Sequence, residues 1–343
     1  MKNLVKGLLT LLCITVLTVS SGCARQKSVI KIKTLTVGFA PVSDVATVYS
    51  AGQPLGLLLK EKLVEQGYVV DDVKVLVGSS YDTVYEGLSN GNIDIALVPS
   101  GTYGQSDSVK YHPILVGLCD SVETDDITVK DIYAGSLPVY DDASLAEYVR
   151  TYFYVNTETS TGKELLEKAE KGTLTFDDLN KANWMVGNPA EEVAYIYPSA
   201  WMMKQFGKPL SSLQHLTTHS SDYDSITALL KGECDIITAQ ADLRSSTTAQ
   251  TAFRIQYPSL ADNGKTVGDV IKVLAVSGPV MNHVILASDN RLMTEEFIGC
   301  LQECFLSILK TGEGEKCLHV LGLKGFAPCT ENDLQIVREV YGK

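Results

Sequence analysis

Apolar residues near the start of the predicted fold follow two spacings, that of a strand and that of a helix. Residues 35–39 and 73–77 have the short apolar pattern of strands, and leucines between Pro54 and Gln66 repeat at helical spacing. Pro54 suits the first turn of a helix, and Gly67 gives that helix a stop. The order of strand, helix and strand predicts a sheet of parallel strands covered by helices.

The stretch 79–103 continues this pattern as loop, helix, turn, strand and loop. Two serines can cap the helix, Gly91 ends it, and residues 93–97 alternate as a strand does. Residues 99–102, after the strand, are small and have free amides and hydroxyls. Ligands of open α/β sheets bind at the carboxyl ends of strands, so we predict that this loop faces a ligand.

A second stretch, 220–242, repeats the same order of features. Tyr-Asp occurs at 81 and again at 223, and Gly-x-x-Asp occurs at 91 and again at 232. The two offsets differ by one residue, so this is not a tandem repeat. Helix, glycine turn and strand are common in any α/β protein, which is one interpretation. The other, which we adopt, is a pair of similar lobes that each present a loop and a helix start to one cleft.

The remaining pattern predicts how the chain crosses between the lobes. Residues 152–155 and 270–276 are the strand candidates chosen as crossings. A helix is expected from Glu191 to Phe206, and helices over 294–310 and after 330 are expected to pack on the first lobe. The predicted fold is α/β, with a doubly wound mixed or parallel sheet and flanking helices in each lobe. The expected division is a signal over 1–22, a linker over 23–33, a first lobe over 34–150 plus 288–343, and a second lobe over 151–287 that includes both crossings.

The first 22 residues have the features of an export signal. Lys2 and Lys6 precede an apolar run, Leu8–Val19, that is too short to span a membrane as a mature helix. Ser21-Gly22-Cys23 follows, and small residues directly before a cysteine resemble a bacterial lipoprotein signal. That resemblance implies that Cys23 is lipidated and anchors the protein to the extracytoplasmic face of the bacterial cell membrane. The alternative is an ordinary signal peptide with an incidental cysteine, and both predict export.

The chain is acidic, which bears on its partners. Its 343 residues include 29 basic and 41 acidic side chains, for a net charge of −12, and loss of the signal removes two lysines and leaves −14. Nucleic acid is not expected as a partner, because phosphate backbones are held by basic patches. The roughly 320 residues that remain are enough for two domains of ordinary size.

Six cysteines follow the N-terminal segment, and all lie within apolar runs: Cys119, Cys234, Cys300, Cys304, Cys317 and Cys329. A small-core role is expected for each, although export leaves a Cys317–Cys329 disulfide open. No C-x-x-C pair occurs, so a zinc ribbon or a thioredoxin-type site has little support.

Several short motifs occur in the order and at the spacing of one family. They are Val37-Gly38-Phe39-Ala40-Pro41, Gly91-x-x-Asp94, Pro99-Ser100-x-Thr102-Tyr103, Tyr195-Ile196-Tyr197-Pro198, Thr218-His219-Ser220 and Gly232-x-x-Asp235. With the lipoprotein signal, they resemble the phosphate, phosphite and phosphonate substrate-binding proteins of ABC importers. The resemblance implies a type II periplasmic-binding-protein fold, in which a small ligand binds between two lobes that close by a hinge motion. It implies docking on a permease with its ATPase, and a monomer without catalytic residues, metal or cofactor.

The resemblance also implies a set of ligand-binding candidates. They are Ser43, Tyr81, Ser100, Gly101, Thr102 and Tyr103 in the first lobe, and His219, Ser220 and Asp235 in the second. Helix amino ends carry free N–H groups and a positive dipole, so two of them facing one cleft can hold an oxyanion without a buried lysine. A structural role is the alternative for each residue; Tyr81 could cover a helix start, and Asp235 could cap a turn.

The chain departs from the family just before Tyr195-Ile196-Tyr197-Pro198. The family usually has a Ser/Thr-Ser-Gly run there, whereas this chain has Pro189-Ala190-Glu191-Glu192. A carboxylate stabilises a helix start, so an exposed, capped turn is one interpretation. If Glu191 or Glu192 instead faces the cleft, it would repel a phosphonate and favour a cationic group. We include Glu191 among the ligand-binding candidates. The expected ligand is a phosphonate- or phosphate-like oxyanion or an aminophosphonate, and the alternative is a cationic or zwitterionic small molecule.

Two further classes of protein are alternatives for this sequence, a surface lipoprotein that has lost transport and an enzyme. His215 and His219, with Asp222 and Asp224, could be a base or a metal cluster. The residues between the two histidines favour a strand, which sets the rings far apart, whereas two metal ligands four residues apart need a helix. No G-x-S-x-G, H-E-x-x-H or P-loop motif occurs, so we predict a binding protein and not an enzyme.

Overall fold

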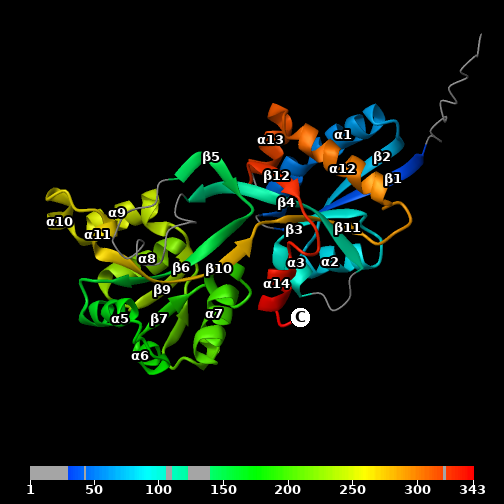
Figure 1. The fold of residues 1–343 in the computed structure, drawn as a ribbon. Coiled ribbons are helices and arrows are strands. Elements are labelled where there is room, and N and C mark those ends of the chain that lie inside the picture. The colour runs from blue at the N-terminus through cyan, green and yellow to red at the C-terminus, as the bar shows by residue number, and fades with distance from the viewer. Residues whose placement is uncertain (1–29, 42–43, 106–109, 123–139, 320–321) are drawn as a thin grey trace, which may run out of the picture.

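The computed structural model describes residues 30–41, 44–105, 110–122, 140–319 and 322–343, which form two α/β lobes joined by two crossing segments (Figure 1). The strands of the larger sheet are β1 (Lys31–Phe39), β2 (Val69–Val77), β3 (Ile95–Val98), β4 (Tyr111–Val122), β5 (Tyr140–Ala146), β11 (Val284–Ser288) and β12 (Gly325–Pro328). Those of the smaller sheet are β6 (Tyr148–Asn156), β7 (Trp184–Val186), β8 (Leu216–Thr218), β9 (Ile236–Gln240) and β10 (Ile271–Met281). The expected α/β class with two mixed sheets is confirmed.

The two sheets share a plan. Their strand orders are β12-β4-β11-β3-β1-β2, with β5 paired to β4, and β10-β6-β9-β7-β8. β1 runs parallel to β2 and β3, and β7 runs parallel to β8 and β9. The two similar stretches of sequence form matching units: α2 (Tyr81–Ser89) leads through Gly91 into β3, and α8 (Asp222–Lys231) leads through Gly232 into β9. Both glycines have a positive φ, 75° and 72°, which favours glycine at each turn.

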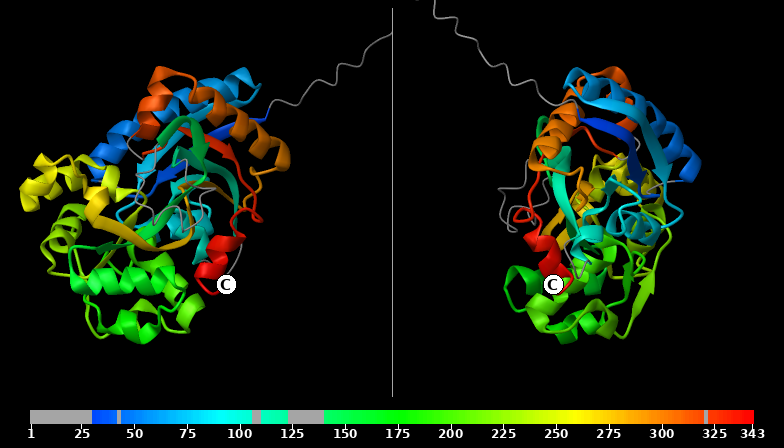
Figure 2. Two further views of the ribbon diagram at one scale, coloured as in Figure 1. Left: turned by 60° about the vertical axis from the view of Figure 1, so that its left-hand side comes forward. Right: turned by 90° about the vertical axis from the view of Figure 1, so that its right-hand side faces the viewer.

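Helices cover both faces of the larger sheet. Successive residues of β3 point to opposite sides and all are buried, so both faces need a cover. Ile95 and Leu97 belong to the core under α1 (Val45–Glu65), α12 (Glu295–Ile308) and α13 (Gly312–His319). Ala96 and Val98 belong to the core under α2, α3 (Ser100–Gly104) and α14 (Gln335–Val340). Figure 2 shows α1, α12 and α13 gathered on one side of this lobe. The C-terminal helices thus pack on the lobe that begins the described chain.

The smaller sheet is covered in the same way. Tyr152 and Tyr154 of β6 face the core under α8, α9 (Thr247–Gln256), α10 (Pro258–Asp262), α11 (Val267–Val270) and the turn η4 (Leu243–Ser245). Phe153 and Val155 face the core under α5 (Ser160–Glu170), α6 (Phe176–Lys181), α7 (Tyr197–Phe206) and the turn η3 (Leu210–Ser212). Each lobe therefore has its own pair of apolar cores.

The two crossing segments are hydrogen-bonded to each other. One leads from β5 into β6 and the other from β10 into β11, and the backbone N–H of Asn282 donates to the carbonyl oxygen of Glu147 at 2.8 Å. The side-chain amide of Asn282 donates to the carbonyl oxygens of Gly117 and Ala146, at 2.9 and 3.0 Å. One asparagine thus ties both crossing segments to β4, where the lobes meet.

The chain differs from the sequence expectations in two local features. The helix expected from Glu191 to Phe206 begins instead with a π-helical turn, η2 (Glu192–Ile196), before α7. The six described cysteines are free thiols, and Cys317 and Cys329 lie in different cores of the larger lobe. The disulfide that export left open is therefore not formed. Cys23 lies outside the described residues, and none of the described helices has the length and apolarity that a membrane crossing needs.

Candidate ligand-binding cleft

A cavity of about 740 Å³ lies between the two lobes. Both lobes contribute to its walls. Its described lining residues are Tyr81, Asp82, Tyr85, Pro99, Gly101, Thr102, Gln105, Asn188, Ala190, Glu191, Glu192, Val193, His283 and Tyr341. This is the size of site that takes a small molecule.

The first-lobe wall is the loop that follows β3. β3 is fully buried, Pro99 ends it, and the chain turns directly into the short helix α3. Ser100 is completely buried, and its hydroxyl donates to the carbonyl oxygen of Met281 at 2.8 Å, which fixes the loop to a crossing segment. A Cβ on Gly101 would collide with the Glu192 carboxyl and the Tyr341 hydroxyl. Glycine is therefore required at 101 for the two lobes to approach this closely.

The second-lobe wall is the turn from Asn188 to Val193. The side chain of Asn188 accepts a hydrogen bond from the Ala190 N–H at 3.0 Å, and the π-helical turn follows. Two buried threonine hydroxyls satisfy carbonyl groups of this turn: Thr151 donates to Val193, and Thr238 donates to Ala194, each at 2.6 Å. π-helical turns inside helices are often found at functional sites. Here the turn directs a carboxyl out of the second lobe toward the first.

That carboxyl belongs to Glu192. Its Oε1 accepts from the Tyr341 hydroxyl at 3.3 Å, and its Oε2 lies 3.5 Å from the Ser100 hydroxyl. The backbone N–H of Gly101 also bonds to it. Burial raises the pKa of Glu192 to about 7, and these hydrogen bonds only partly oppose the effect. The carboxyl is therefore shared between its neutral and charged forms near neutral pH.

Neighbouring groups are affected by the same low-dielectric environment. Burial, followed by the Glu192 and Glu191 carboxyls, raises the pKa of Tyr81. Burial and Glu192 raise the pKa of Tyr341 as well. Burial lowers the pKa of His283 to about 4, so this imidazole is neutral at pH 7. None of the described lining residues is a lysine or an arginine, so the described walls supply no positive side chain at that pH.

The structure brings some of the predicted first-lobe residues to the cavity. Tyr81, Gly101 and Thr102 line it, and Ser100 lies behind the wall, in contact with Glu192. Tyr103 is instead buried in the apolar core, where its ring packs against Tyr111 at a centroid distance of 6.2 Å. Ser43 lies outside the described residues.

The predicted second-lobe residues lie in two places. Glu191 lines the cavity and is exposed. His219, Ser220 and Asp235 are not among its described lining residues. The Ser220 hydroxyl donates to the Asp224 carboxylate at 2.7 Å at the start of α8, and Asp235 accepts from the Asn183 backbone at 2.8 Å. His219, Ser220 and Asp235 therefore stay predictions, because they are not among the described residues that line the cavity with Tyr81 and Gly101.

The residue that spans the cleft is Glu192, whereas the sequence predicts its neighbour Glu191 as the ligand-binding residue. Both carboxyls were visible in the same departure from the family motif, but their spacing alone does not say which one is directed inward. Tyr341 and His283 carried no signal in the sequence. Tyr341 lies just beyond α14, and it reaches the cleft only because that helix packs on α3.

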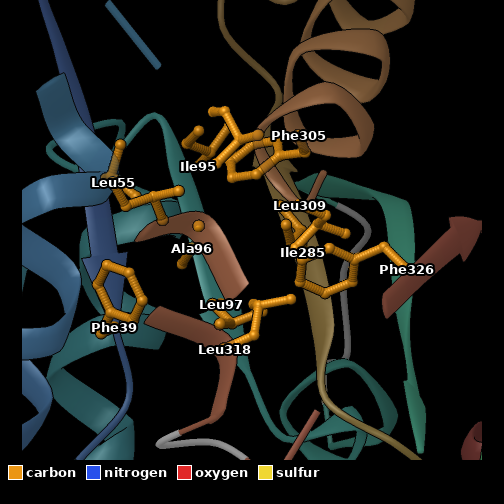
Figure 3. Close-up of a pocket in the computed structure, with 13 residues that line it drawn as sticks. Phe39, Leu55, Ile95, Ala96, Leu97, Ile285, Phe305, Leu309, Leu318 and Phe326 are labelled. Atoms are coloured by element: carbon orange, nitrogen blue, oxygen red, sulfur yellow. The ribbon is translucent and has the colours of Figure 1, made fainter. Parts of the chain in front are cut away.

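A second enclosed space lies within the core of the larger lobe (Figure 3). It measures about 10 Å³ and is walled by apolar residues such as Phe39, Leu55 and Phe305. A bound water would need a few polar partners as well as room, and the described walls of this space provide apolar side chains. It is a packing gap rather than a site for a polar ligand.

The sequence of the chain matches a known protein family. The model described as "ABC transporter, phosphonate, periplasmic substrate-binding protein" matches residues 37–334. The chain belongs to this family. Its members are extracytoplasmic binding proteins that serve a permease and its ATPase, and the family is one of transport proteins rather than enzymes. The expected family and fold are thereby confirmed, while no curated protein sequence matches the chain significantly.

Solved structures with the same fold differ widely in sequence from this chain. The p37 protein of Mycoplasma hyorhinis, described as a proposed thiamine pyrophosphate transporter, has a TM-score of 0.64 and 14% identity, over 92% of this chain and 99% of that one. A Xanthomonas citri protein bound to ATP has a TM-score of 0.56 and 12% identity, over 90% and 96%. PhnD1 from Prochlorococcus marinus in complex with methylphosphonate has a TM-score of 0.51 and 13% identity, over 90% and 97%. At these identities the similarity establishes the fold alone.

Proposed function

We propose that this protein is the lipid-anchored, extracytoplasmic solute-binding component of an ABC importer. The observation that supports this most is the cavity of about 740 Å³, whose walls come from both lobes. A ligand that contacts both walls stabilises the closed form, and the hinge that closes is the pair of crossing segments held by Asn282. The closed form docks on the permease, and a lipid on Cys23 keeps the protein at the membrane surface as a monomer.

Two ligand classes are supported by different observations. The family, and the methylphosphonate bound by PhnD1, favour a phosphonate- or phosphate-like oxyanion. The described walls of the cleft instead contain the carboxyls of Asp82, Glu191 and Glu192 and no lysine or arginine. An anion in such a site lacks a counter-charge and meets like charges, which opposes binding.

The lining therefore favours a ligand that carries a cationic group. Tyr81, Tyr85 and Tyr341 line the same cavity, and aromatic faces attract cations in addition to carboxyls. We propose a small cationic or zwitterionic solute as the ligand. An aminophosphonate is the zwitterion that agrees with the family, and a simple oxyanion is the second candidate.

The test is a thermal-shift titration of the protein from residue 24 onward, which keeps every described residue. The panel contains phosphate, methylphosphonate and 2-aminoethylphosphonate, with choline, spermidine and amino acids. A ligand at 100 times its dissociation constant stabilises by about 2.7 kcal/mol, which is a clear shift in melting temperature. We expect shifts with cations or zwitterions. Shifts with phosphate and methylphosphonate alone would support the oxyanion candidate instead, and no shift with any compound would favour a surface lipoprotein without transport.

A further inference from the structure

One side chain of the second lobe is bound by polar groups of the first. Glu192 comes from the π-helical turn before α7, yet its carboxyl contacts the Ser100 hydroxyl, the Gly101 backbone N–H and the Tyr341 hydroxyl, all of the larger lobe. The contact is close enough that no side chain fits on Gly101. Within the described part of the chain, Glu192 takes part in no ion pair with a lysine or arginine.

The groups around Glu192 are those that a small oxyanion would use. A carboxylate is an acceptor with two oxygens, and the backbone N–H of Gly101 and the hydroxyl of Tyr341 are donors. These donors converge at the first-lobe wall of the cleft. They are already satisfied by an acid that belongs to the protein itself.

A purely structural contact between the lobes would not need an acid here. A serine, threonine or asparagine could accept from the same donors without the cost of burying a carboxyl that has no cationic partner. The exposed neighbour Glu191 shows that this turn can also hold a carboxyl in contact with solvent. The partly buried position of Glu192, in contact with the opposite lobe, therefore calls for a reason other than stability.

We propose that Glu192 sets the specificity of the cleft as a built-in carboxyl group that fills the place of a ligand oxyanion. Its carboxyl takes the Gly101 backbone N–H and the Tyr341 hydroxyl, the two donors that a ligand oxyanion would otherwise use. The cleft then rejects a free phosphonate or phosphate at this wall and selects a solute whose cationic group faces Asp82 and Glu191. This inference rests on the proposed function, because it assumes that the cleft is the ligand site.

The test compares wild type with Glu192→Ser and Glu192→Gln by isothermal titration calorimetry, using methylphosphonate, inorganic phosphate and choline as probes. Serine vacates the wall and leaves a hydroxyl, whereas glutamine is neutral but as large as glutamate. We expect Glu192→Ser to bind methylphosphonate at least about tenfold more tightly than wild type, because both the occupant and its charge are removed. Glu192→Gln removes only the charge, and we expect it to gain much less.

Two control variants accompany the test. Glu61→Gln makes the same charge change on the exposed surface of α1, outside the described cleft lining, and should leave the affinity for methylphosphonate as in wild type. Glu191→Gln removes a carboxyl from the cleft without vacating the first-lobe wall, so its gain for methylphosphonate should stay well below that of Glu192→Ser. Glu192→Ala provides the same vacancy if the melting curve of Glu192→Ser shows that the serine variant does not fold.

The outcomes separate this inference from the proposed function. A gain with Glu192→Ser but not with Glu192→Gln supports the inference, whether or not choline binds wild type. Wild-type binding of methylphosphonate within about twofold of Glu192→Ser would overturn the inference, because twofold is below 0.5 kcal/mol, and would leave a binding protein for oxyanions. If wild type does not bind choline but Glu192→Ser gains affinity for methylphosphonate, the cationic ligand is contradicted and the inference about Glu192 stands.

Discussion

Glu192 illustrates how much the chemistry of a residue depends on its surroundings. Glu191, its neighbour in sequence, is exposed, whereas Glu192 is enclosed by groups of the opposite lobe, and burial raises its pKa from 4.5 to about 7. Between these two values the folded protein binds more protons than the unfolded chain. Stability therefore falls as the pH rises through this window, and the neutral form of the carboxyl is the one that suits the folded state.

We expect Glu192→Gln to be more stable than wild type at pH 8 and close to it at pH 4.5. The difference between a pKa of 4.5 and one of about 7 corresponds to at most about 3.5 kcal/mol at alkaline pH, because one pKa unit is worth about 1.4 kcal/mol. The measurement is the free energy of unfolding by urea across pH 4.5–8. Glu61→Gln is the control and should retain the wild-type pH slope. Equal slopes for wild type and Glu192→Gln would show that the carboxyl does not titrate in this way.

In each lobe an aspartate fixes the repeated helix, turn and strand unit to a neighbouring segment. Asp94, which directly precedes β3, accepts a hydrogen bond from the Thr36 N–H at 2.8 Å. Asp235, which directly precedes β9, accepts one from the Asn183 N–H at 2.8 Å. Each carboxylate thus joins its strand to a neighbouring segment at the same point of the unit. The Gly-x-x-Asp motif of both lobes accordingly has a structural use in this fold.

Replacement of either aspartate should lower stability by a similar amount. Asp94→Ala and Asp235→Ala each lose a charge-assisted hydrogen bond to a backbone N–H, which is worth about 1.5–3 kcal/mol when protected from water and less where exposed. The measurement is the melting temperature of each single variant and of the double variant. Additive losses are expected, because the two sites lie in separate lobes. If only one of the two single variants has a lower melting temperature, the two motifs are not equivalent.

The whole molecule is held together at the cleft by contacts from Glu192 and at the hinge by Asn282. In its ionised form Glu192 opposes closure, since no lysine or arginine among the described lining residues offsets the burial of its charge. When it loses its proton, opening of the lobes returns the carboxylate to water. The neutral imidazole of His283 and the tyrosines Tyr81 and Tyr341 do not offset that charge at pH 7–8.

Ligand-free protein should therefore be more compact at pH 5.5 than at pH 8. Small-angle X-ray scattering measures this as a smaller radius of gyration at the lower pH. Glu192→Gln should remain compact at both values, while Glu61→Gln should respond as wild type does. A wild-type radius that is the same at both values would indicate that the Glu192 contact is too weak to influence the positions of the lobes.

Much of this architecture follows from local pattern, and part of it does not. The strand and helix periods, the glycine turns at 91 and 232 and the order of motifs were sufficient to predict two α/β lobes and the family. These features depend on residues close together in the chain, so the sequence displays them directly. The same local logic failed for the helix before Phe206, because the π-helical turn is stabilised by Thr151 and Thr238 from two distant strands.

The sequence by itself determined the α/β class, the family and the presence of two adjacent acids at 191 and 192. Only the tertiary structure decided that Glu192, and not Glu191, contacts Ser100 and Gly101 across the cleft, that Tyr341 joins them, and that Tyr103 is part of the core. The physical reason is that these contacts join residues about 90 to 150 positions apart. The direction of a side chain at such a contact is set by the packing of whole lobes, and no spacing along the chain records it.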